Sequence, residues 1–158
     1  MPNFWKLSMG THAGGGEFSN LSAVRSWVRQ RTVLVWGPTG RKGGSHRTQG
    51  ELFEQRAKIG DLFYLCHGNQ EPGVLLLGRF SGLADTVIVP GGRPNWLGRK
   101  FTLIKHSKSK AKYEGVEKWW TPDHNSTFVM IPNRDLEQFE SVILNPYFGL
   151  NLNELQLK

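Results

Sequence analysis

The segment "GDLFYLCHGNQEPGVLLLGRF", residues 60–80, predicts two strands joined by a turn. Apolar residues dominate 61–67 and 73–80, and short apolar runs of this kind are typical of buried strands. The turn between them, GNQEPG, holds the glycine, proline and amide residues that favour a chain reversal. We therefore expect both runs to be strands.

Further strands and helices are predicted on either side of this pair. Alternation divides the strand FWKLSM into two faces, one made of Trp5, Leu7 and Met9 and the other of Phe4, Lys6 and Ser8. The other predicted strands are 32–36, 85–90, 100–106 and 127–132, and the predicted helices are 20–30, 51–60 and 134–144. Gly60 is expected to close the second helix, Asn133 to cap the third and Pro146 to stop it.

This order of elements predicts an α+β fold: a curved mixed sheet or small β-barrel flanked by helices. At 158 residues the chain is expected to be one domain spanning 1–158, either complete or excised from a larger protein. It has no apolar run of the roughly 20 residues that span a bilayer, and its start lacks the layout of a signal peptide. A single cysteine, Cys66, excludes an internal disulfide, so we expect a cytoplasmic protein that contacts no membrane.

The net charge of +7 is unevenly distributed along the chain. Residues 1–118 hold 18 of the 20 lysines and arginines but only 8 of the 13 acidic residues. The remaining 40 residues are therefore slightly acidic. A basic body of this kind is typical of proteins that bind polyanions, although a solvated basic surface gives the same pattern.

Several kinds of chemistry are not supported by the sequence. The loop after residue 36 has Lys42 where a P-loop requires glycine, and the five histidines are too far apart to indicate a zinc site. Cys66 and His67 are adjacent on a predicted strand and point to opposite faces, so they do not pair as nucleophile and base. We therefore expect a non-catalytic domain with no metal and no cofactor.

Tryptophan and basic residues occur together in three segments. Trp5 and Trp27 fall on apolar faces and are expected in the core, whereas the other four lie beside runs of arginine and lysine: Trp36, Trp96, Trp119 and Trp120. Aromatic rings stack on nucleobases, and the flanking cations bind phosphates. The candidate phosphate-binding residues are Arg41, Lys42, Arg47, Arg93, Arg99 and Lys100.

Four segments in this order resemble the YTH and EVE domains of the PUA-like superfamily: "FWKLSMG", "VLVWGPTGRKGG", "GDLFYLCHGNQEPGVLLLGRFSG" and "PNWLGRKFTLIKH". The resemblance covers roughly residues 4–132 at the level of pattern. It implies a curved sheet or barrel whose pocket holds a modified base between aromatic side chains. Carried over by position, Trp36 and Trp96 would be cage walls, Ser8 and Met9 the floor, and Trp119 and Trp120 additional aromatic contacts.

The resemblance also implies a function. Prokaryotic domains of this kind often form the DNA-reading module of modification-dependent restriction enzymes, including the McrB-like and HNH-fused kinds. We therefore expect a reader that flips a modified base, with 5-methyl- or 5-hydroxymethylcytosine favoured, out of duplex DNA. Its partner would be a nuclease or NTPase domain or subunit of a type IV restriction system. The alternatives are an N6-methyladenine reader acting on DNA or RNA and a non-catalytic protein-interaction module.

Overall fold

The computed structural model describes residues 2–9, 24–26, 28, 33–36, 56–67, 73–87, 96–109, 111–124 and 128–156. The strands in these ranges are β1 (Phe4–Met9), β2 (Val33–Trp36), β3 (Leu62–His67), β4 (Gly73–Phe80), β5 (Asp85–Val87), β6 (Trp96–His106) and β7 (Phe128–Met130). They are followed by η2 (Asn133–Asp135), α3 (Leu136–Phe139), η3 (Glu140–Phe148) and α4 (Leu152–Gln156).

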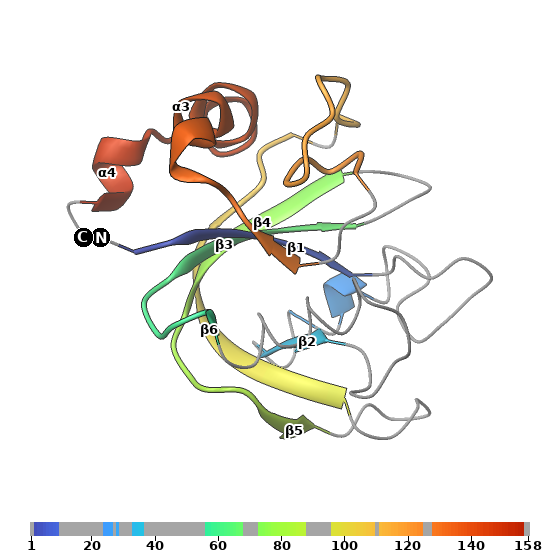
Figure 1. Ribbon diagram of the computed structural model, residues 1–158. Coiled ribbons are helices and arrows are strands. Elements are labelled where there is room, and N and C mark those ends of the chain that lie inside the picture. Colours follow the sequence, from blue (N-terminus) through green and yellow to red (C-terminus); the bar gives the residue numbers. More distant parts are fainter. Residues whose placement is uncertain are drawn as a thin grey trace.

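The strands form one mixed sheet in the order β2-β6-β4-β3-β1-β7, with β5 also paired to β6. β1 and β3 are parallel and every other pair is antiparallel. Figure 1 shows β6 bending through the molecule, so that β2 and β5 lie opposite β1, β3 and β4. The α+β class and the mixed sheet are thus as expected. A closed barrel is not found among the described strands, because their pairing path runs open from β2 to β7.

Both faces of the central strands are buried, as their apolar sequences predict. β1 pairs with β3 in a register that sets Phe4 opposite Leu62 and Trp5 opposite Phe63. On one face, Trp5 stacks on Phe128 of β7 with ring centroids 4.7 Å apart. The other face packs against the C-terminal helices, in a cluster that includes Phe4, Leu62, Tyr64, Trp120, Phe139, Ile143 and Phe148.

The buried carboxylate of Asp61 joins the start of β1 to the turn before β3. It accepts hydrogen bonds from the Trp5 indole N–H at 3.0 Å and from the backbone N–H groups of Asn3 at 3.1 Å and Lys58 at 3.0 Å. Gly60, which precedes it, has a φ of 96° that favours glycine. Residues 57–60 form a bend and a turn, so the predicted helix does not reach Gly60.

The C-terminal helical segment corrects a prediction about Pro146. Instead of stopping the helix, Pro146 lies inside η3, which is a π-helix that continues to Phe148. A proline removes only its own N–H, and the wide turns of a π-helix leave room for its ring. The segment ends at Gly149, whose φ of 66° is the left-handed conformation typical of a helix terminus.

Gly78 in β4 is a point of close approach between the sheet and the aromatic core. A methyl group added there would lie 2.7 Å from the Phe63 ring and 3.0 Å from the Phe101 ring. Those two rings meet edge to face with centroids 5.4 Å apart, so neither can withdraw without disturbing the other. The absence of a side chain at 78 is therefore a packing requirement.

We expect Gly78→Ala to lower the free energy of unfolding by about 1–3 kcal/mol, because it overpacks the core. Gly82→Ala is the matched control, since the added carbon would meet Lys100 Cβ at an ordinary 3.4 Å. Thermal unfolding of both variants measures the difference. Equal melting temperatures would show that the aromatic rings around position 78 can move apart.

Candidate nucleic-acid interface

β6 and the segment after it are rich in lysine and arginine and contain no acidic residue in the stretch 99–113. Residues 99–113 include six lysines and arginines and no acidic residue. In the described part of this run, the side chains of Lys100, Lys105, Lys108 and Lys112 are exposed to solvent. At about 3.3 Å per residue, Lys100 and Lys105 lie at most about 17 Å apart along the strand. This spacing lets one strand present charge to several phosphates.

Two of these lysines also lie at the C-terminal end of a helix. A side-chain carbon at Gly149, just beyond η3, would lie 3.2 Å from the Lys108 Nζ and 4.0 Å from the Lys105 Nζ. The Lys108 N–H also donates to the Tyr147 carbonyl at 2.8 Å. Cations are favourable at this end of a helix dipole, so Lys105 and Lys108 have a structural reason for their position. Lys100 lies on the first half of β6, which pairs with β2, and is therefore distant from the end of η3.

A cavity of about 500 Å³ opens beside the same strand. Its apolar lining is formed by Val28, Val74, Leu75, Leu76, Phe101 and Leu103. Its polar lining is formed by Arg25, His106, Ser107 and Ser109. Arg25 and Val28 thus contribute to one wall, and β4, β6 and the segment just after β6 contribute the rest. The volume falls within the roughly 300–1,000 Å³ typical of small-molecule pockets.

Arg99 corrects a prediction, because it is buried rather than available to phosphate. Only 1% of its surface is exposed. Its guanidinium donates to the carbonyls of Gly82 at 3.0 Å and Ala57 at 2.5 Å, and it lies 4.5 Å above the Phe80 ring. Burial lowers the pKa of Arg99, and the charge of Asp61 opposes that shift. Arg99 therefore holds loops against the sheet.

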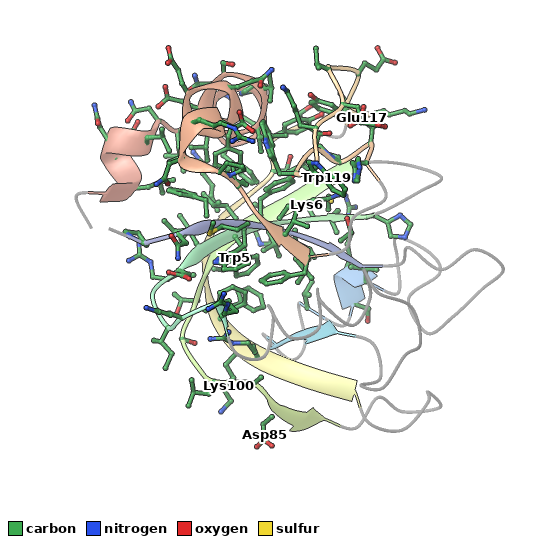
Figure 2. All side chains as sticks on the ribbon, viewed as in Figure 1. Trp5, Lys6, Asp85, Lys100, Glu117 and Trp119 are labelled. Atoms are coloured by element: carbon green, nitrogen blue, oxygen red, sulfur yellow. The ribbon has the colours of Figure 1, made fainter. Side chains whose placement is uncertain are left out.

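Trp119 and Trp120 have different environments although they are adjacent. Trp120 is 1% exposed and its indole N–H donates to Asp135 at 3.0 Å, so its expected role as a base contact is wrong and it is a core residue. Trp119 is 69% exposed and its ring lies 4.7 Å from that of His124. Figure 2 shows Trp119 and Lys100 on opposite sides of the molecule, so they do not belong to one compact surface.

Ser8 belongs to a buried polar cluster between β1 and β3. Its hydroxyl shares a 3.0 Å hydrogen bond with the Cys66 thiol, directly across the parallel ladder. Burial raises the pKa of Cys66, although the charge of Lys6 and the bond to Ser8 oppose that shift. A buried thiol with a raised pKa is a poor nucleophile. The expected place of Ser8 in a pocket floor stays a prediction, as does that of Met9, of which only the backbone is described.

Lys6 is a buried lysine that the sequence did not single out. Its side chain is fully buried and its Nζ donates to the His124 carbonyl at 2.9 Å. Burial lowers the pKa of Lys6, while Cys66, Asp123 and Glu117 act in the opposite direction. The pKa of His124 is lowered first by the burial of its ring and second by the nearby charge of Lys6. Lys6 thereby ties the loop that carries Trp119 to the sheet.

The two tryptophans expected to form a cage lie on paired strands. Trp36 ends β2 and Trp96 begins β6, and the register pairs Trp36 with Leu97. Because Trp36 is opposite Leu97, strand alternation places position 96 on the other face of the sheet from position 36, and the register does not bring the two together as walls of one cage. Four of the expected phosphate-binding residues lie outside the described part of the chain: Arg41, Lys42, Arg47 and Arg93.

Within the described residues, no group of three or more histidine, cysteine or acidic side chains could hold a metal ion. No helix in the described ranges is long and apolar enough to cross a membrane. No family model matches the chain, and no curated protein matches it. Among solved structures, the protein Atu2648 from Agrobacterium tumefaciens is similar with a TM-score of 0.38 and 14% identity. That match covers 66% of this chain and 62% of the other.

Replacing Arg99 should affect stability, whereas replacing its neighbour should not. We expect Arg99→Gln to lower the free energy of unfolding by about 1–3 kcal/mol, because the carbonyls of Ala57 and Gly82 lose a charged partner. Lys100→Gln removes an exposed charge and should change it by about 0.5 kcal/mol or less. Chemical denaturation of the two variants compares them. An Arg99→Gln protein as stable as Lys100→Gln would return Arg99 to the list of candidate phosphate contacts.

Proposed function

We propose that this protein binds duplex DNA and reads a modified base that is extruded from the helix. We further propose that it acts as the targeting domain of a type IV, modification-dependent restriction system, without catalytic activity of its own. 5-Methyl- or 5-hydroxymethylcytosine is the favoured base. The observation that carries the proposal is the exposed basic run along β6 and its continuation, which has no acidic residue between Arg99 and Tyr113.

Charge of this kind supplies affinity for the phosphate backbone but no sequence information. Discrimination has to come from contacts with the base itself. The support for such contacts is the resemblance to YTH and EVE domains. Trp36 pairs with Leu97 in the β2–β6 ladder, whereas Trp96 pairs with Val87 in the β5–β6 ladder. Lys100 pairs with Val33 in the β2–β6 ladder, so the candidate phosphate contact lies in the same part of β6 as the two candidate stacking residues.

The first test measures selectivity with a panel of identical duplexes that differ in one base. We expect tighter binding to the duplex with 5-methyl- or 5-hydroxymethylcytosine than to its unmodified twin. A preference for N6-methyladenine would support the alternative function, an N6-methyladenine reader. A preference for modified single-stranded RNA would show that the target is RNA and not duplex DNA. Equal affinity for all duplexes would contradict base reading, and binding insensitive to salt would favour a protein-interaction module.

The second test separates stacking from packing. Trp36→Ala and Trp96→Ala should each weaken binding of the modified duplex by about 1–3 kcal/mol, because one stacked face is lost. Binding of the unmodified duplex should change little, since the backbone contacts remain. Trp5→Ala is the core control and should instead lose about 3–5 kcal/mol of folding stability. Trp36→Ala or Trp96→Ala proteins that keep full discrimination would show that the tryptophan in question is not part of the base site.

The third test concerns the phosphate contact at Lys100. Lys100→Gln should reduce the slope of the logarithm of affinity against the logarithm of salt concentration by about 0.9, and equally for modified and unmodified duplexes. Arg134→Gln, an exposed cation on η2, is the matched control and should leave the slope unchanged. An unchanged slope in Lys100→Gln would place Lys100 outside the interface.

A further inference from the structure

We propose that the cavity beside β4 and β6 is a second nucleotide-binding site, separate from the positions of Trp36 and Trp96. Phe101 and Leu103, which line it, lie five and seven residues beyond Trp96 on the same strand. These two residues belong to the half of β6 that pairs with β4, whereas Trp96 and the partner of Trp36 belong to the half that pairs with β2 and β5. The cavity is thus an additional site, and the proposed base reading does not depend on it.

The apolar part of the cavity fits the flat ring of a base. Val28, Leu76 and Phe101 are all nearly buried, and they give the inner wall a fixed shape. Leu103 is 41% exposed, so a ligand would enter the cavity from its side. Burial of the base between aliphatic and aromatic side chains would strengthen binding of the ligand, because apolar surface is removed from water and the base contacts the Phe101 ring.

The polar part of the cavity fits a phosphate. Arg25 is an exposed guanidinium, which matches phosphate oxygens with two parallel N–H donors. Ser107 is held in place, because its hydroxyl donates to the Ser109 carbonyl at 2.8 Å and accepts from the Ser109 N–H at 3.3 Å. The Ser109 hydroxyl accepts from the Ala111 N–H at 3.1 Å, and its own proton can then be donated to a ligand.

The combination of these two parts identifies the occupant as a nucleotide. No acidic side chain is among the described lining residues, and Lys105 and Lys108 are next in sequence to residues of the polar wall. An uncharged apolar ligand would leave Arg25 without a partner, and an inorganic anion would leave the apolar wall empty. A base with an attached phosphate uses both. Two sources provide this chemistry: a nucleotide of the bound nucleic acid and a free mononucleotide.

The test titrates the protein with deoxycytidine monophosphate and deoxyadenosine monophosphate, and with the corresponding nucleosides, while following chemical shifts by NMR. We expect both nucleotides to bind more tightly than their nucleosides. Leu103→Trp should fill the cavity and weaken nucleotide binding about tenfold or more. Its matched control is Leu83→Trp, the same change at a position that is 73% exposed and does not line the cavity. Melting temperatures confirm that both variants are folded.

A second variant tests the phosphate contact without altering the core. Arg25→Gln should weaken nucleotide binding several-fold and leave nucleoside binding unchanged, whereas Arg134→Gln should change neither. If Leu103→Trp is unfolded, Arg25→Gln decides the proposal. Equal binding of nucleotide and nucleoside, or Leu103→Trp binding as well as Leu83→Trp, would overturn it. So would the absence of nucleotide binding at millimolar concentration.

A competition experiment with unmodified duplex DNA distinguishes the two sources. Displacement of the bound mononucleotide by the duplex would identify the occupant as a nucleotide of the nucleic acid. Simultaneous binding would identify it as a free nucleotide. The proposed reading of modified bases fails separately, through equal affinity in the duplex panel, because that readout uses Trp36 and Trp96. Loss of nucleotide binding in Leu103→Trp with duplex discrimination intact would confirm two independent sites.

Discussion

The bend of β6 is the constraint on which the other features depend. Its second half pairs with β4 and its first half with β2 and β5, so one strand joins the two layers of the sheet. The packing at Gly78 holds that geometry, because the Phe63 and Phe101 rings occupy the space that a side chain would need. The same strand contributes Phe101 and Leu103 to the cavity and Lys100 to the basic run. A change in its curvature would therefore move the hydrophobic wall and the charges together.

Covering the sheet on both faces imposes a second condition on the centre of the fold. Polar groups on β1 and just before β3 lose water, and they remain stable only where protein groups replace it. Asp61 meets this condition by accepting three hydrogen bonds, and Lys6 by donating to the His124 carbonyl. All of these bonds except the one from the Lys58 N–H join segments that are distant in sequence. The polar groups of the core thus fix which loops lie against which strands.

The sequence was informative where a single local pattern determined the structure. The apolar runs at 61–67 and 73–80 predicted β3 and β4 almost to the residue, because continuous apolar runs and the turn between them set strand ends locally. β6 begins four residues before the predicted strand. The Gly-Arg-Pro sequence that precedes Trp96 indicates a loop, and only pairing with β2 and β5 shows that the strand starts there. Pro146 likewise gave the local signal of a stop, but the π-helix of η3 accommodates it.

The candidate site was less predictable, because charge alone does not say where a cation lies. Arg99 and Lys100 are adjacent in sequence, yet one is buried against carbonyls and the other is exposed. The difference arises from the alternation of β6 together with Ala57 and Gly82, which are brought near only by the fold. The cavity had no sequence signal either, since its walls come from Arg25, Val28, β4, β6 and the segment just after β6.

The burial of particular cations has a consequence for the proposed binding of a polyanion. Lys6 and Arg99 count toward the net charge of +7, but both are nearly or fully buried. Lys105 and Lys108 lie at the end of η3, where the helix dipole already favours their charge. Backbone affinity depends on the cations that contact phosphates and release counterions, not on the total. In the proposed function, the number of phosphates that the protein contacts would therefore be smaller than the basic composition indicates. Contacts with the base would then have to supply a correspondingly larger share of the affinity for a modified duplex.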